Sequence, residues 1–151
     1  MEAAIQHEVH SFAWNHEGAG AHVANGALQY MYQQIEGGVM CSMAMTYSAL
    51  PSLHSTPGIA EEWIPRLLST TYDPRDIPVE QKLGATMGMF MTEKQGGSDV
   101  RANSTRAVPA GIGEGVGQEY RITGHKFFSS APMCDAFLVL AYSGGGLSCF
   151  L

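Results

Sequence analysis

The chain has 151 residues, of which 45% are hydrophobic and 15% charged, so it is long enough for one core or for two small units that share an interface. Its net charge is −6, and residues 1–65 contain six Glu but no Lys or Arg. Because affinity for nucleic-acid phosphates comes mainly from Lys and Arg, this charge argues against direct nucleic-acid binding by the chain.

The sequence shows no segment for membrane insertion or export. No apolar run reaches about 18 residues, and the first residues, MEAAIQHEVH, lack the basic and apolar regions of a secretory signal. We therefore expect a cytoplasmic protein without membrane contacts. Cys41, Cys134 and Cys149 are odd in number and show no C-x-x-C spacing, so we expect buried free thiols rather than disulfides or a zinc site.

Residues 1–70 are expected to be helical. Apolar side chains recur at helical spacing at Ile5, Val9 and Phe12, and again at Val23, Ala27, Tyr30, Met31 and Ile35. The motif EGG at 36–38 predicts a helix end, and the apolar segment VMCSMAMTYSAL predicts a buried helix that ends at Pro51. Ile59, Trp63 and Leu67 predict another helix, with Pro65 opening a second short one.

From residue 85 the pattern changes to short alternating segments. Six strand candidates are separated by Gly, Pro, Asn or Ser: TMGMFMT, NSTRAV, EYRI, HKFF, FLVLAY and LSCFL. Helices followed by strands predict an α+β fold with two domains, residues 1–84 and 85–151. The glycine-rich segment at 109–118 predicts a long, flexible hairpin connection. Since the chain stops at Leu151 within an apolar strand, whose exposed edge would favour aggregation, we expect it to be a fragment.

Several short motifs do not meet the spacing that their chemistry requires. In HEVH, His7 and His10 are three residues apart instead of the four of a zinc-binding helix, so we expect no metal site. Neither GAGAHVANG nor GIGEGVG has the glycine spacing of a dinucleotide-binding loop, and no P-loop lysine motif is present. No serine lies in a nucleophile elbow, so we interpret Ser98 in GGSD as a ligand contact.

The segment MTEKQGGSDV at 91–100 carries more polar chemistry than a connection needs. Gly96 and Gly97 can adopt positive φ, which allows successive N–H groups to face one anionic or carbonyl oxygen. Hydroxyls and an apolar wall suited to a flat ring come from Thr92, Ser98, Met89 and Met91. By itself the segment is compatible with a cofactor loop and with an ordinary hairpin, which is the more common structure.

Two aromatic residues and two hydroxyls follow each other in GHKFFSS at 124–130. Phe127 or Phe128 can stack on a conjugated ring while Ser129 reaches its polar edge, with Ser130 adjacent. A Phe pair in a strand with one buried face is the simpler interpretation of this motif alone. The two segments together favour a cofactor site.

Together, MTEKQGGSDVRANSTRA and YRITGHKFFSS resemble the middle-domain signature of the acyl-CoA dehydrogenase superfamily, T-E-P-x-x-G-S-D, T-x-A and N-G-x-K-x-W-I-T. Lys94 and Gln95 replace the common Pro and its neighbour, and FFS replaces WIT. Both departures resemble the AidB-like, adaptive-response subfamily, although Phe127 stands where that subfamily has tryptophan. The resemblance extends through SAPMCDAFLVLA, GGLSCF and YDPRDIPVEQKLGATMGM, and it is most specific over residues 82–151.

The resemblance implies an FAD-binding flavoprotein with an N-terminal helical domain, a middle antiparallel β-barrel domain and a C-terminal helical bundle, assembled as a homotetramer. This chain would then hold part of the helical domain and an incomplete barrel, with the bundle missing. The residues implied to contact FAD are Met89, Phe90, Met91, Thr92, Gly97, Ser98, Phe127, Phe128, Ser129 and Ser130. Thr92, Ser98 and Ser130 are also implied to contact acyl-CoA or a related substrate.

The implied reaction is α,β-dehydrogenation of an acyl-CoA thioester, in which a carboxylate removes the α proton and the β hydrogen leaves as hydride to flavin N5. The family places that carboxylate in the C-terminal bundle, so we expect the catalytic Glu beyond Leu151 and no activity from this chain alone. One alternative is a DNA-alkylation-response flavoprotein that binds DNA through the missing C-terminal domain. Another is an interaction protein or degenerate fragment without a cofactor.

Overall fold

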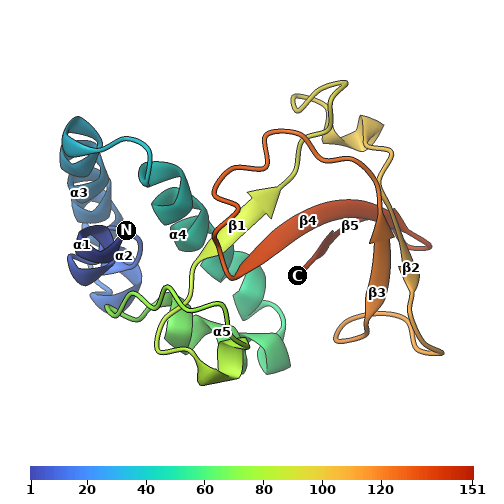
Figure 1. Ribbon diagram of the computed structural model, residues 1–151, viewed down its shortest axis with the longest axis horizontal. Helices are drawn as coiled ribbons and strands as arrows, with labels where there is room; N and C mark the ends of the chain where they lie inside the picture. Colours follow the sequence, from blue (N-terminus) through green and yellow to red (C-terminus); the bar gives the residue numbers. More distant parts are fainter.

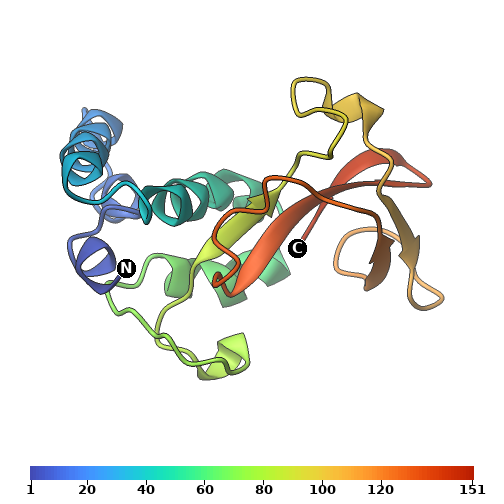
Figure 2. The same cartoon turned by 45° about the horizontal axis from the view of Figure 1, so that its top comes forward.

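A computed structural model describes all residues 1–151 and confirms the α+β prediction, with the helices gathered on one side of the molecule and the sheet on the other (Figures 1 and 2). The helices precede the strands in the chain. They are α1 (Glu2–Gln6), α2 (Phe12–Asn15), α3 (Ala21–Ile35), α4 (Met40–His54) and α5 (Pro57–Leu67), followed by the 3₁₀ turn η1 (Val79–Gln81). None of them is both long enough and apolar enough to cross a membrane.

Helix α3 ends at the predicted EGG motif. The Glu36 carboxylate accepts hydrogen bonds from the N–H groups of Gly38 at 2.8 Å and Val39 at 2.9 Å, which caps the turn before α4 and lowers the pKa of Glu36. The regularly spaced apolar side chains of α3 lie on the solvent side, however, with Ile35 78% exposed. The helix instead buries Asn25, whose side-chain oxygen accepts from the N–H of Ala13 at 3.1 Å.

The predicted helix end at Pro51 is wrong, because α4 continues to His54. A proline inside a helix leaves the carbonyl four residues earlier without its usual N–H partner. That carbonyl belongs to Tyr47, and it accepts a hydrogen bond from the indole N–H of Trp14 at 3.2 Å. Pro65 likewise lies inside the last turn of α5 and does not open a second helix, since the helix already begins at Pro57.

The sheet is built around β4 (Figure 1). Its strands are β1 (Met87–Phe90), β2 (Arg106–Pro109), β3 (Tyr120–Thr123), β4 (Ala136–Ser143) and β5 (Gly146–Phe150). Strand β4 pairs in parallel with β1 and with the start of β2, and antiparallel with β5, while β2 and β3 form an antiparallel hairpin. The prediction of an antiparallel barrel is therefore wrong: the sheet is partly parallel and does not close, because the long connection between β1 and β4 allows a parallel crossover.

Five of the six predicted strands are confirmed, and HKFF is the exception. Lys126 forms only an isolated bridge with Glu93, and Phe128 has a φ of 56°. Positive φ is uncommon for a residue with a bulky side chain and is incompatible with a regular strand. The segment is a turn-rich loop between β3 and β4.

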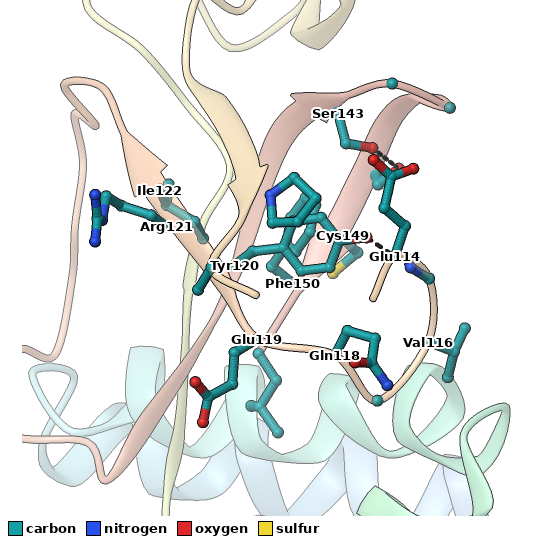
Figure 3. Close-up of a pocket in the computed structure, with 18 of the residues that line it drawn as sticks. Glu114, Val116, Gln118, Glu119, Tyr120, Arg121, Ile122, Ser143, Cys149 and Phe150 are labelled. Atoms are coloured by element: carbon teal, nitrogen blue, oxygen red, sulfur yellow. Dashed lines mark hydrogen bonds between the residues drawn. The ribbon is translucent and has the colours of Figure 1, made fainter. Parts of the chain in front are cut away.

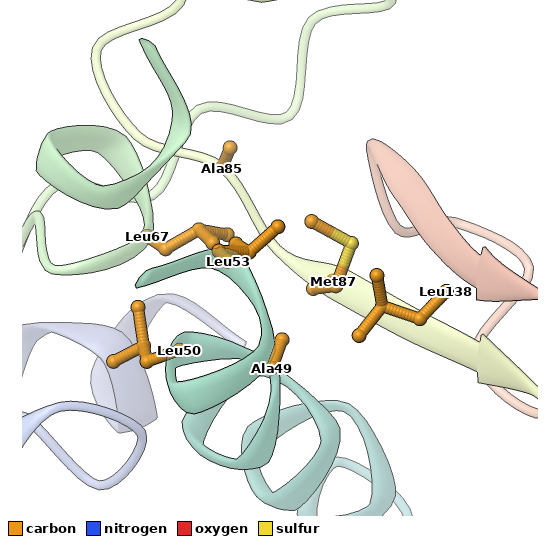
Figure 4. Close-up of a cluster of buried hydrophobic side chains, with 7 residues drawn as sticks. All are labelled: Ala49, Leu50, Leu53, Leu67, Ala85, Met87 and Leu138. Carbon is orange, nitrogen blue, oxygen red and sulfur yellow. The ribbon is translucent and has the colours of Figure 1, made fainter. Parts of the chain in front are cut away.

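The main core lies between the helices and the sheet (Figure 4). Helices α4 and α5 contribute Leu50, Leu53 and Leu67, and the sheet side contributes Met87 and Leu138. Each fully buried side chain of this kind stabilises the fold by about 1.5–3 kcal/mol. A second cluster joins α1 to α4 through Ala4, Ile5, Val9, Met40 and Met43. The main core fixes β1, and hence the loop that follows β1, against the helices.

The three cysteines are free thiols, but only Cys134 is buried as predicted. Cys41 and Cys149 are exposed. Cys41 follows the buried Met40 on α4 and points to a different side of that helix. Cys134 lies in the loop before β4, where its sulfur is 3.3 Å from the hydroxyl of Ser42 on α4, so tertiary contact decides that this thiol is buried.

Gly88 on β1 is a position where a side chain does not fit, because a Cβ there would overlap the ring of Phe137 on β4. We expect Gly88→Ala to lower the free energy of unfolding by about 1–3 kcal/mol, measured by urea denaturation. Gly26→Ala in α3 is the matched control, since no atom lies within 4 Å of the added methyl. It should leave stability unchanged or raise it by about 1 kcal/mol. Equal stability of the two variants would contradict this account of the β1–β4 contact.

Candidate functional site

The structure brings the two sequence motifs together beyond the end of β1. The first loop runs from Met91 through the 3₁₀ turn η2 (Val100–Ala102) to β2, and the second is residues 124–135 between β3 and β4. Figure 1 shows the second loop running back across the end of β1. The backbone N–H of Phe127 donates to the carbonyl of Thr92 at 3.0 Å, so the two loops are joined directly.

A buried carboxylate lies at this junction. Glu93 is 1% exposed and accepts six hydrogen bonds, three on each oxygen. Ser104 donates to Oε2 through its N–H and its hydroxyl, both at 2.7 Å, and Gln95 Nε2 donates to the same oxygen at 2.9 Å. Thr105 donates to Oε1 through its N–H at 2.8 Å and its hydroxyl at 2.5 Å, and Lys126 Nζ lies 3.3 Å from Oε1.

These contacts set the protonation state of Glu93. Burial by itself raises the pKa of a carboxyl group, because it disfavours the charged form. The hydrogen bonds from Thr105, Gln95 and Ser104 outweigh burial and hold the pKa of Glu93 far below its ordinary value of 4.5. Glu93 is therefore ionised at neutral pH. Its charge is matched by the ammonium group of Lys126, whose side chain is 9% exposed.

Further contacts fix the shape of the first loop. The amide of Asn103 donates to the carbonyl of Met91 at 2.9 Å. Gly96 has a positive φ of 153°, as predicted, whereas Gly97 does not. Gly97 is required for a different reason: a Cβ there would lie 2.7 Å from the hydroxyl oxygen of Thr92. Close approach to Thr92, rather than unusual backbone geometry, excludes a side chain at Gly97.

The predicted site residues on β1 divide between its two faces, as strand alternation requires. Met89 packs against the main core, and Phe90 stacks on Phe137 with ring centroids 4.2 Å apart. Met91 follows the strand and is half-buried. Its carbonyl accepts from both Asn103 and Lys126 Nζ, the latter at 3.4 Å.

The remaining predicted residues present aromatic faces and hydroxyl groups to the outside. Phe127 is 45% exposed and Phe128 75%, and their rings form an edge-to-face pair with centroids 4.9 Å apart. Four hydroxyls make no hydrogen bond within the chain and remain free to bind a ligand: those of Thr92, Ser98, Ser129 and Ser130. Aromatic rings beside free hydroxyls fit a flat conjugated ring with a polar edge, and in this respect the residues present fit a flavin.

A second ion pair lies next to the first residues of the parallel strands β1 and β4, away from the Glu93 end of β1. Lys82, with a side chain 4% exposed, donates to Asp135. The other carboxylate oxygen of Asp135 accepts from the N–H of Thr86 at 2.7 Å. This pair resembles Glu93–Lys126 in burial and chemistry, but it lies before β1 rather than after it.

A large open cavity lies elsewhere on the sheet (Figure 3). Its volume is about 990 Å³, and its walls come from the 109–122 hairpin, the β4–β5 turn and the start of α5. Tyr120 and Phe150 pack there with ring centroids 5.0 Å apart. None of the predicted site residues lines this cavity.

Sequence reasoning missed the residues that hold the two loops together. Glu93 and Gln95 lie in the first motif, but the sequence does not show that they belong to a buried network, and it assigns no role to Lys126, Ser104 and Thr105. A charged residue directly after a strand and a run of hydroxyl residues are weak signals by themselves. The contact between them depends on how β2 and β4 pair, which local periodicity does not specify.

Two family models match the chain. Residues 1–74 match the model described as the adaptive response protein AidB N-terminal domain, and residues 88–151 match the acyl-CoA dehydrogenase middle domain. The two matches leave only residues 75–87 between them.

Two known proteins are similar to this chain in sequence. The chain is 45% identical to AidB of Escherichia coli (strain K12) over 152 aligned residues, which cover 99% of this chain and 27% of that protein. It is 36% identical to acyl-CoA dehydrogenase family member 11 of Caenorhabditis elegans over 118 residues, which cover 74% of this chain and 17% of that protein. The chain therefore spans only part of the length of these relatives.

Two solved structures share the fold. The apo form of Bd2924 superposes with a TM-score of 0.80 and 29% identity, covering 98% of this chain and 29% of that chain. Caenorhabditis elegans ACDH-11 in complex with C11-CoA superposes with a TM-score of 0.72 and 28% identity, covering 99% of this chain and 24% of that chain.

The depressed pKa of Glu93 predicts a pH dependence of stability. The unfolded chain binds a proton near pH 4.5, whereas folded Glu93 stays ionised, so the free energy of unfolding should fall as pH drops below about 5. Glu93→Gln should be less stable at pH 7 and show a shallower decline in urea denaturation between about pH 5 and pH 3. Asp73, whose pKa is lowered chiefly by its hydrogen bond from Arg75, should supply part of the remaining decline. An unchanged slope in Glu93→Gln would show that Glu93 does not titrate in this way.

Proposed function

Because the chain belongs to the acyl-CoA dehydrogenase family, in its AidB-like branch, we propose that it forms the flavin-facing part of an FAD-dependent oxidoreductase that dehydrogenates acyl-CoA thioesters. The observation that carries the proposal is the joining of the two loops through Phe127 and Thr92, beside two exposed Phe rings and four free hydroxyls. Bound FAD would supply flavin N5 as the acceptor for the β hydrogen of the substrate.

In this proposal, the residues of this chain bind the flavin ring and the substrate and orient them. Phe127 and Phe128 cover a ring face and exclude water, while the Thr92 hydroxyl donates to or accepts from the ring edge. Ser98 and Ser130 contact the substrate as well as the cofactor. The similar ACDH-11 structure is a complex with C11-CoA, which supports an acyl-CoA as the substrate class for this chain too.

Glu93 is unsuited to act as the base that removes the α proton. Its two oxygens already accept six hydrogen bonds, and its pKa lies far below neutrality. An efficient general base has a pKa near the working pH and a free lone pair directed at the proton. We propose that the catalytic carboxylate lies beyond Leu151 and that the full-length protein is a homotetramer.

The AidB match supports a second candidate function, a DNA-alkylation-response flavoprotein. With a net charge of −6, this chain is not suited to bind the phosphate backbone of DNA, so DNA would bind to a separate basic domain of the full-length protein. Fluorescence anisotropy with duplex DNA at two salt concentrations, together with acyl-CoA turnover, distinguishes the two functions. Salt-sensitive DNA binding without turnover would favour the second.

An absorbance spectrum of the purified full-length protein provides the first test. We expect flavin bands, either as purified or after FAD is added and the excess removed. Absence of flavin under both conditions would reject both flavoprotein functions and leave the cofactor-free alternative.

Thr92 allows a sharper test in the full-length protein. We expect Thr92→Val to weaken FAD binding about fivefold, because removal of one hydrogen bond costs about 1 kcal/mol. The measurement is FAD affinity by flavin fluorescence. Thr71→Val is a control, since Thr71 lies in the exposed loop after α5 and its hydroxyl also lacks a partner. Equal FAD affinity in Thr92→Val and wild type would remove Thr92 from the site.

A further inference from the structure

We propose that Glu93 is a positioning residue whose ionised carboxylate holds the two cofactor loops in one fixed arrangement; its effect on the cofactor rests on the function proposed above. Glu93 does not itself need to touch the cofactor. It lies one residue after Thr92 and bonds to Lys126, one residue before Phe127. Thr92 and Phe127, which are expected to contact the ring, are thus the direct chain neighbours of the two residues of the ion pair.

The carboxylate links segments that no regular strand pairing connects at this point. Oε2 binds Gln95 and Ser104, both in the first loop, and therefore closes that loop on itself. Oε1 binds Thr105, the residue directly before β2, and Lys126 in the second loop. One side chain thus joins the end of β1, the start of β2 and the loop before β4.

Gln95 extends this network. Its side-chain amide donates to Glu93 Oε2 at 2.9 Å and to the carbonyl of Ala102 at 3.2 Å, so it ties the glycine turn to η2. Gln95 therefore gives the AidB-like motif a structural role in shaping the turn that contains Gly96 and Gly97.

The Lys82–Asp135 pair provides a matched control for simple destabilisation. Both ion pairs are largely buried, with side-chain exposures of 9% and 1% for Lys126 and Glu93, and 4% and 15% for Lys82 and Asp135. Loss of one partner of either pair leaves an uncompensated charge and should lower stability. Only loss of a partner of the Glu93–Lys126 pair should loosen the contact between the two loops, because Asp135 lies at the far end of the second loop, directly before β4.

The test compares Glu93→Gln, Lys126→Met and Asp135→Asn in the full-length protein, by thermal unfolding, FAD affinity and hydrogen exchange. We expect all three variants to unfold at lower temperature. FAD affinity should fall about tenfold in Glu93→Gln, the factor that corresponds to one charge-assisted hydrogen bond, and should stay at the wild-type value in Asp135→Asn. Lys126→Met should weaken FAD binding less than Glu93→Gln.

Hydrogen exchange reports on the loops without reference to FAD. The N–H groups of Ser104 and Thr105 bond to Glu93, and that of Phe127 bonds to Thr92. We expect all three to exchange faster in Glu93→Gln, only that of Phe127 in Lys126→Met, and none in Asp135→Asn. Unchanged exchange in Glu93→Gln, or equal acceleration in Asp135→Asn, would overturn the positioning role. A wild-type protein that binds no FAD would reject the proposed function, while the exchange data would still decide the role of Glu93.

Discussion

The arrangement of the candidate site depends on the desolvated carboxylate of Glu93. A buried charge is costly unless it is paired and fully hydrogen-bonded. Here six donors, one of them an ammonium group, meet that requirement, and they come from segments that are separate in sequence. Because the cost of leaving Glu93 unpaired is large, those segments have little freedom to move apart.

The hydrogen bonds around Glu93 can position the two loops only because strand β1, which leads into the first loop, is itself fixed. Strand β1 is anchored by Met87 in the main core and by its parallel pairing with β4. Before the strand, Asp135 accepts from Lys82 and from the N–H of Thr86. Buried apolar contacts and two ion pairs thus hold β1 at both ends. The loop that carries the exposed rings of Phe127 and Phe128 is bonded to this fixed strand end through Thr92 and Glu93.

Much of the fold could be predicted from local pattern. The change from helical to alternating periodicity indicated the order of helices and strands, and EGG marked the end of α3. The errors arose where a distant partner changed the local outcome. Trp14 satisfies the carbonyl that Pro51 leaves free, so α4 continues, and HKFF bonds to the first loop through Lys126 rather than to a neighbouring strand.

The sequence by itself determined the family, the α+β order of elements and the two motifs of the candidate site, because these depend on residue type and short spacing. Only the tertiary structure decided that the sheet is partly parallel, that the apolar side of α3 faces solvent and that Glu93 is the junction of the two loops. These features depend on strand pairing and burial between residues far apart in the chain. The identity of a residue as glutamate does not specify whether its carboxylate is solvated or, like that of Glu93, buried among six hydrogen-bond donors.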